Sequence, residues 1–232
     1  MNRAKVINLC PDFIKRTIRF IIKIINEKRP TYIKPKIRSN NPLRDLLAVN
    51  SSYKDTRSWS IDKAHVIYIA GAVLSKKPKN ILEIGIGSGY VTTNLFYSLK
   101  YNNLGTLTCV DNWHDWHGKE PKHIKFMEKS EIKIINKSEK EFVKNCDDNM
   151  FDFLVSDGDH NNSGTWINEY LRIIQNNGFM FFHDTNLEDD YPNLQLIGKR
   201  IFELNLPHYH FKISTRNDEE CENGILFVIN NK

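Results

Sequence analysis

The stretch from Asn80 to Tyr90, N-I-L-E-I-G-I-G-S-G-Y, limits what this chain can fold into more than any other part of the sequence. A short apolar run leads through Glu83 into three alternating glycines, and a helical pattern follows over residues 91–99. A buried strand that turns through glycines onto a helix is typical of a nucleotide-binding turn, because glycine lets the backbone approach a ligand closely. A dinucleotide fingerprint would need glycine where Tyr90 stands. The pattern is E-x-G-x-G-x-G instead, and its glycines are Gly85, Gly87 and Gly89.

Strands and helices alternate along the rest of the chain. Apolar runs predict strands over residues 81–84, 105–110, 132–135, 151–156, 179–182, 207–214 and 224–229. Helical patterns are found over residues 61–74, 91–99, 139–145, 163–175 and 194–204. This alternation predicts an α/β fold with a doubly wound, seven-stranded, mostly parallel sheet. The last two strands have no helix between them, so we expect a hairpin whose final strand is antiparallel to the rest.

Two helices allow more detailed predictions. In the helix over residues 61–74, the side chains expected to face inward are those of Ala64, Ile67, Tyr68, Gly71 and Ala72. The helix over residues 163–175 is expected to end at Asn176-Asn177-Gly178, since glycine is common just past a helix C-terminus.

Polar residues follow the predicted strands, at the edge where an open α/β sheet binds its ligands. Asp111 ends the second strand, where a carboxylate can accept hydrogen bonds from both hydroxyls of a ribose; a solvated turn aspartate is the alternative. Asn112 and Trp113 open a loop rich in Trp and His. Aromatic rings in that loop can stack on adenine or on an apolar or sugar face, or they can pack within the loop.

A second polar group follows the fourth and fifth strands. Asp157 and His160 come after the fourth strand, and His183 and Asp184 after the fifth. Adjacent strand ends lie about 5 Å apart, and two carboxylates this close repel each other unless a cation or a proton compensates. The sequence therefore predicts a divalent metal site with open positions. A histidine alone at position 160 is more simply explained as a loop residue, but the nearby Asp157 and Asp184 favour a role as general base.

The E-x-G-x-G-x-G turn resembles the first motif of the class I S-adenosylmethionine-dependent methyltransferases. The segments F-L-V-S-D-G-D-H and F-M-F-F-H-D-T resemble a metal-dependent O-methyltransferase branch of that class. This branch includes catechol O-methyltransferase-like enzymes and, closer still, the macrocin and macrolide-sugar O-methyltransferases. The resemblance extends over residues 60–230 and is specific at the glycine turn and at D-G-D-H.

The resemblance implies roles for individual residues. S-adenosylmethionine would be bound by Glu83, Gly85, Gly87, Gly89, Tyr90, Asp111, Asn112, Trp113, Ser138 and Asp157. Asp157, His183 and Asp184 would hold Mg²⁺ or Mn²⁺, and His160 would act with Asp157 in catalysis as the base. Several family members have an acidic residue where His183 stands. Histidine is a poorer magnesium ligand, so either the metal is softer, such as manganese or iron, or His183 is not a ligand and Asn186 is a reserve.

The expected function is that of a metal-assisted O-methyltransferase that uses S-adenosylmethionine to methylate a hydroxyl of a sugar or glycan precursor. A bound metal lowers the pKa of the acceptor hydroxyl, and a neutral histidine can take its proton. Two alternatives stay open: a catechol-type enzyme for small phenols, and a scaffold that binds the cofactor without catalysis. An NAD-dependent oxidoreductase is disfavoured by Tyr90 and by the lack of a recognisable hydride-transfer site.

Charge separates an N-terminal segment, residues 1–45, from the predicted methyltransferase domain, residues 46–232. Residues 1–40 hold eleven Lys/Arg against two Asp/Glu, whereas the remaining 192 residues hold 22 against 26. A slightly acidic domain argues against nucleic-acid binding. Residues 10–29 form a basic amphipathic pattern, which predicts either a helix on an anionic membrane surface or one packed on the domain or on a second subunit of a homodimer. Four widely spaced cysteines favour a reducing compartment, so we expect a cytoplasmic protein. If residues 10–29 lie on a membrane, we expect that surface to be the inner membrane face.

Overall fold

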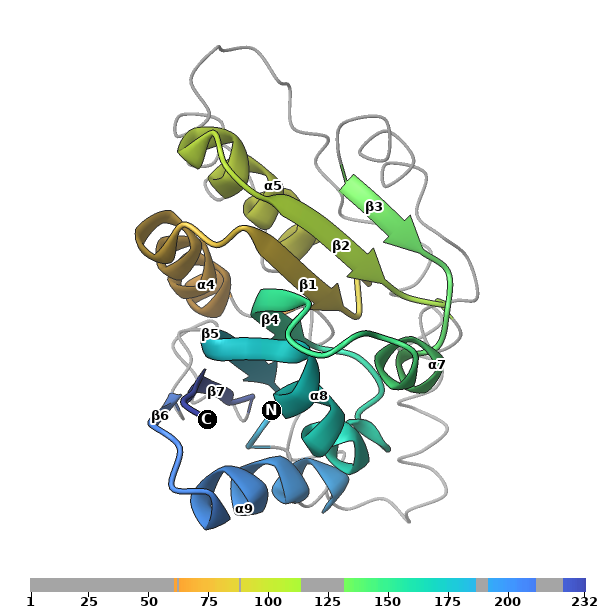
Figure 1. The fold of residues 1–232 in the computed structure, drawn as a ribbon. Coiled ribbons are helices and arrows are strands. Elements are labelled where there is room, and N and C mark those ends of the chain that lie inside the picture. Colours follow the sequence, from red (N-terminus) through yellow and green to blue (C-terminus); the bar gives the residue numbers. More distant parts are fainter. Residues whose placement is uncertain (1–60, 62, 88, 114–131, 187–191, 212–222) are drawn as a thin grey trace, which may run out of the picture. The chain divides into compact units, whose positions relative to one another are not determined.

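Helices and strands alternate in the computed structural model, which describes residues 61, 63–87, 89–113, 132–186, 192–211 and 223–232 (Figure 1). Its helices are α4 (Lys63–Lys76), α5 (Tyr90–Asn102), α7 (Glu139–Lys144), α8 (Ile167–Ile173) and α9 (Gln195–Glu203), with the short 3-10 helices η1 (Ser163–Trp166) and η2 (Pro192–Leu194). Its strands are β1 (Asn80–Ile84), β2 (Thr106–Val110), β3 (Ile132–Ile135), β4 (Phe151–Ser156), β5 (Ile174–His183), β6 (His208–Phe211) and β7 (Ile225–Asn230).

The seven strands form one sheet in the order β3-β2-β1-β4-β5-β7-β6. Strands β1 to β5 are parallel to their neighbours among these five, and β7 is antiparallel to both β5 and β6. The predicted doubly wound, seven-stranded sheet with an antiparallel final strand is confirmed. The strand order reverses at β1 and β4, and open α/β sheets bind their ligands beyond the carboxyl ends of strands at such a point.

Helices cover both faces of the sheet, because successive strand side chains point to opposite faces. On one face, α4 and α5 bury Val66 and Leu95 in a cluster with Ile81 of β1. On the other face, α7, α8 and α9 pack over the alternate strand residues, such as Leu82. The carboxyl edge of the sheet is left between these two layers.

The buried face of α4 differs from the prediction. Its buried residues are His65, Val66, Ile69, Ala70 and Val73. Ile67 is 50% exposed and Gly71 is exposed, so the prediction is wrong for these two residues. Tyr68 is 37% exposed, but its ring packs on aromatic rings of the sheet, and Ala72 packs against the core, so the predicted inward face is right in part. The helix is apolar on nearly every side between residues 64 and 74. A pattern without a polar face cannot fix the rotation of a helix about its axis.

The end of α8 also differs from the prediction. The helix ends at Ile173, and β5 begins at Ile174. The left-handed residue is Asn177, with φ of 60°, whereas Gly178 pairs with Asn230 in the sheet, so the predicted helix end at Gly178 is wrong. Asn230 explains the early end, because its buried Nδ2 donates to the carbonyl of Ile174 at 2.7 Å. That partner is 56 residues away in the sequence, so local pattern could not reveal it.

Some predictions fall outside the described residues. The basic segment 10–29 and the boundary after residue 45 are among them, as is the loop that follows Trp113. Among the helices that the structure does describe, none combines the length and the apolar character required to cross a membrane.

Candidate functional site

The candidate site is built by polar residues at and just after the carboxyl ends of β4 and β5. Ser156 of β4 pairs with Phe182 of β5, so Asp157 and His183 come next on two neighbouring strands at the carboxyl edge. Asp184 follows with φ of 56°, a left-handed conformation in which aspartate is more common than most residues. The loop after β4 then brings His160 to Asp184.

Two carboxylates and two imidazoles meet at this edge. His160 Nε2 lies 2.6 Å from Asp184 Oδ2 and 3.6 Å from Asp157 Oδ1. His183 Nδ1 lies 3.3 Å from Asp157 Oδ1 and 3.1 Å from Asp184 Oδ1. The His183 side chain is 2% exposed, whereas that of His160 is 27% exposed. Each imidazole therefore bridges both carboxylates, one from the buried side and one from the open side.

The charges of this cluster stabilise one another. Burial opposes ionisation of the two histidines, but the two aspartates raise the pKa of His160 to about 11 and that of His183 to about 10. Burial likewise works against the charge of Asp157 and Asp184, yet the nearby imidazoles lower the pKa of both carboxyls. Without a bound cation, the group therefore holds two imidazolium ions against two carboxylates at neutral pH.

Three members of this cluster fit a divalent cation. One ligand atom from each of Asp157, His160 and Asp184 lies within 4.8 Å of the others. Asp184 Oδ1 is buried without a well-aligned hydrogen bond. The two carboxylates suit Mg²⁺ or Mn²⁺, whereas an imidazole as third ligand would favour a softer metal. His183, which the sequence predicts as a ligand in place of His160, contacts the same carboxylates from their buried side, and its ligand role stays a prediction.

The glycine turn lies directly against the loop that carries Asp157. Gly85, Gly87 and Gly89 all have positive φ, at 82°, 48° and 77°. A Cβ on Gly85 would stand 2.1 Å from the carbonyl oxygen of Asp157, and the N–H of Asp157 donates to the carbonyl of Ile84 at 2.8 Å. Glycine is thus required at position 85 because the glycine turn contacts the backbone of the loop that carries Asp157. The sequence showed the glycines but not this partner.

Asp111 holds the glycine turn in place. Its Oδ2 accepts hydrogen bonds from the N–H groups of Ile86 at 2.8 Å and Gly87 at 3.1 Å. Its Oδ1 accepts one from the N–H of Trp113 at 2.6 Å. The carboxylate predicted to bind a ribose therefore also orders the backbone on which the cofactor is expected to lie.

Glu83 is fully buried beneath the same turn. Its Oε1 accepts a hydrogen bond from Thr92 Oγ1 at 2.9 Å, and its Oε2 accepts one from Cys109 Sγ at 3.0 Å. Burial raises the pKa of Glu83 to about 8, although both hydrogen bonds oppose the rise. Glu83 therefore joins β1 to β2 and α5 as an uncharged acid at neutral pH. Its predicted contact with the cofactor stays a prediction.

The other residues assigned to the cofactor surround the turn in different ways. Tyr90 is the buried first residue of α5, and Asn112 is exposed. Trp113 is 2% exposed and belongs to the core cluster under α4 and α5. Ser138 Oγ accepts a hydrogen bond from the N–H of Glu141 at 3.2 Å and so caps α7. These assignments also stay predictions.

Two buried residues near the site were not singled out from the sequence. His65 of α4 is 3% exposed, and its Nδ1 lies 3.2 Å from His183 Nε2. Glu139, the first residue of α7, is 8% exposed and lies behind the loop after β4. His65 could have been found had the rotation of α4 been known. Glu139 looked like an ordinary first-turn acid, and no local signal shows that it is buried.

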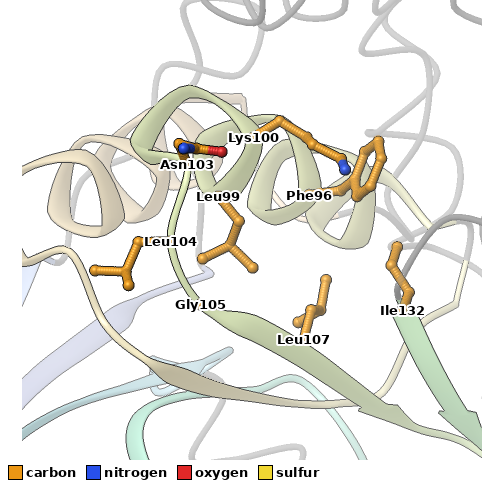
Figure 2. A pocket seen from close by; sticks show the side chains of 8 residues that line it. All are labelled: Phe96, Leu99, Lys100, Asn103, Leu104, Gly105, Leu107 and Ile132. Carbon is orange, nitrogen blue, oxygen red and sulfur yellow. The ribbon is translucent and has the colours of Figure 1, made fainter.

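A cavity of about 200 Å³ lies elsewhere, between α5 and the beginnings of β2 and β3 (Figure 2). It is lined by Phe96, Leu99, Lys100, Asn103, Leu104, Gly105, Leu107 and Ile132. Figure 2 shows Lys100 and Phe96 together on α5, and the Lys100 Nζ lies 5.5 Å from the ring centre. These eight residues include no carboxylate or imidazole. Gly105 directly precedes β2, and Ile132 is the first residue of β3. The cavity is therefore separate from the site at the carboxyl edge.

Comparison with known proteins agrees with this arrangement. Residues 82–185 match the family model of a methyltransferase domain, a span that begins in β1 and ends just after Asp184. The predicted methyltransferase is supported by this match. A search of curated proteins found no match.

Solved structures share the fold at low sequence identity. One is a putative O-methyltransferase from Klebsiella pneumoniae, with 14% identity, a TM-score of 0.63, and coverage of 85% of this chain and 93% of that one. Another is an O-methyltransferase from Bacillus cereus in complex with SAH, with 17% identity, a TM-score of 0.56, and coverage of 84% and 93%. A third is the O-methyltransferase TomG from Streptomyces achromogenes in complex with SAM, with 12% identity, a TM-score of 0.58, and coverage of 84% and 92%. The chain therefore has the fold of these proteins along most of its length.

Proposed function

We propose that this chain is an S-adenosylmethionine-dependent O-methyltransferase, assisted by a divalent cation, that acts on a hydroxyl of a sugar or glycan precursor. The observation that carries the proposal is the convergence of Asp157, His160 and Asp184 within 4.8 Å beside the glycine turn. An acid–base group and a cofactor turn in contact are what an alkyl transfer to a weakly acidic oxygen requires. The names of the structures that share the fold, O-methyltransferases bound to SAM or SAH, support the same reaction class.

The residues of the turn fit the cofactor. The backbone over Gly85–Gly89 has no side chains at its three left-handed positions, and Asp111 fixes it through Ile86 and Gly87. When bound there, S-adenosylmethionine supplies an activated methyl group on a sulfonium centre. The turn then orients the cofactor, and holding the reactants in line can contribute about 7–11 kcal/mol to lowering the barrier.

The acid–base group fits the cation. Asp157 and Asp184 would hold it, and His160 stands at the open side of both. A bound Mg²⁺ or Mn²⁺ lowers the pKa of an acceptor hydroxyl. His160 can accept a proton at Nε2 only when it is neutral. The two free carboxylates raise its pKa to about 11, so it is protonated at neutral pH. Its role as a base therefore requires that Asp157 and Asp184 have another cationic partner.

Calorimetry of S-adenosylhomocysteine and Mn²⁺ binding, on the wild type and on Asp184→Asn, tests the proposal. The product should bind both proteins, and Mn²⁺ should bind only the wild type. If the product binds but Mn²⁺ does not bind the wild type, the cation part of the proposal fails. If neither binds, the cofactor part fails as well.

The acceptor is tested separately by methyl transfer to sugar nucleotides, to glycolipids and to catechol. Turnover of catechol alone would replace the sugar acceptor with a small phenol. Cofactor binding without any turnover would favour the scaffold alternative.

A further inference from the structure

The carboxylate of Glu139 is buried behind the loop that carries Asp157 and His160. Glu139 is 8% exposed, and its Oε1 accepts a hydrogen bond from the hydroxyl of Tyr170, which is itself fully buried. Its Oε2 accepts hydrogen bonds from the N–H of Asp159 and from Ser163 Oγ, both at 3.0 Å. Within the described parts of the chain, no Lys or Arg forms an ion pair with it. A buried carboxylate is costly, so hydrogen bonds must offset its loss of water.

These hydrogen bonds fasten both flanks of the site loop. Ser163 closes the loop at one flank, since its N–H donates to the carbonyl of Asp159 at 2.7 Å. Its Oγ lies 2.7 Å from the same carbonyl and 3.0 Å from Glu139 Oε2, and the two acceptors share its single hydroxyl proton. At the other flank, the Tyr170 hydroxyl lies 3.4 Å from Oγ of Ser156, the residue before Asp157. Between them, Gly158 lies so close that a Cβ there would stand 2.5 Å from Glu139 Oε2. The loop therefore rests on the Glu139 carboxylate.

We propose that Glu139 is a positioning residue that holds the loop from Asp157 to Ser163 so that the Asp157 carboxylate and the His160 imidazole face Asp184. That this alignment serves catalysis rests on the proposed function, whereas the contacts of Glu139 with the loop do not depend on it. A buried carboxylate with a role in the core alone could take its hydrogen-bond donors from any neighbouring element. All three donors to Glu139 belong instead to the loop or to the tyrosine that supports it. When a residue orients metal ligands without binding the metal itself, its mutation typically lowers the affinity for the metal about 10–100-fold.

The test compares Glu139→Gln with the matched control Glu141→Gln. Glutamine keeps the shape of Glu139 but turns an NH₂ group toward groups that are themselves donors. Glu141 lies one residue beyond Lys140 on the same helix, its side chain is 53% exposed, and it pairs with Lys137 at 2.9 Å. Two quantities are measured on each protein: the ring nitrogen chemical shifts of His160 without metal, and the dissociation constant for Mn²⁺.

In Glu139→Gln, we expect the His160 signals to move and the Mn²⁺ dissociation constant to rise about 10–100-fold, with Glu141→Gln like the wild type. Unchanged His160 signals and unchanged Mn²⁺ affinity in a folded Glu139→Gln would overturn the proposal, even if the protein were less heat-stable. If the wild type binds no Mn²⁺, the cation part of the proposed function fails, and the His160 signals alone decide on Glu139. Should Glu139→Gln not fold, Tyr170→Phe removes one donor and must shift the same signals to a smaller extent.

Discussion

Two acidic groups lie at the same edge of the sheet and reach opposite charge states. Glu83 at the end of β1 is fully buried with a hydroxyl and a thiol as partners, and its pKa is raised to about 8. Asp157 and Asp184 after β4 and β5 are also largely buried, yet the pKa of each is lowered, because His160 and His183 lie beside them.

Burial alone therefore does not decide the charge of a carboxyl group in this protein. Neutral donors compensate only part of the loss of water, so the protonated form of Glu83 is favoured. Imidazolium partners compensate more, so the aspartates stay ionised. The difference suits the two regions, since an uncharged Glu83 can support a turn, while an ionised pair of aspartates would suit the cation proposed above.

Removing a carboxylate from the charged group should have the largest effect. Asp157→Asn leaves His183 with one carboxylate fewer and removes a predicted metal ligand. We expect methyl transfer to fall by more than about 10⁴-fold, because both the metal and the base act through this residue. Asp148→Asn is the control, since Asp148 is exposed and pairs with Arg172 at 2.6 Å. A loss of less than ten-fold in a kinetic assay would contradict the role of Asp157.

Removing the exposed imidazole should have the next largest effect. We expect His160→Gln to lower kcat about 10²–10⁴-fold while S-adenosylhomocysteine affinity is retained, because the base is lost but the glycine turn is intact. In the metal-free wild type, the raised pKa of His160 stabilises the fold fully below pH 6.5, and this stabilisation is lost as pH rises through about 11. Urea unfolding of both proteins across that range measures it. An identical pH dependence in wild type and variant would refute the ion pair with Asp184.

Glu83 should show its charge state in a different pH window. Its folded-state pKa of about 8 lies above the ordinary value of 4.5, so the folded state keeps a proton that the unfolded state releases. Between these two values, the free energy of unfolding should fall by about 1.4 kcal/mol per pH unit from this group. Glu83→Gln carries no proton to release and should remove this slope. Urea unfolding at pH 5, 6.5 and 8 tests it, and a slope that persists unchanged in the variant would assign it to other groups.

The smallest expected effect concerns the link between α4 and the charged group. His65→Leu removes the contact between His65 Nδ1 and His183 Nε2 at 3.2 Å. We expect a loss of about 1 kcal/mol in stability and weaker Mn²⁺ binding, with S-adenosylhomocysteine affinity unchanged. Ile67→Leu is the control, since Ile67 is 50% exposed on the same helix. If His65→Leu weakened the binding of Mn²⁺ and of S-adenosylhomocysteine equally, the charged group and the glycine turn would not act independently.

The sheet was predictable because its strands are short apolar runs separated by glycine and polar turns. The runs over residues 132–135 and 151–156 match β3 and β4 residue for residue. The boundary at Ile174 was not predictable, since it depends on the side chain of Asn230. The rotation of α4 was not predictable either, because nearly every side of that helix is apolar.

The sequence by itself determined the succession of strands and helices along the chain and the glycine turn. It also determined that Asp157, His160, His183 and Asp184 lie at one edge of the sheet. These follow from local pattern and from the rule that parallel strands end on the same side. Only the tertiary structure decided which of these groups are charged and what holds them. Packing between distant segments sets burial, and burial together with contacts such as those of Glu83, Glu139 and His65 sets the pKa values and the geometry. Those contacts join residues far apart in the chain, where no periodic signal links them.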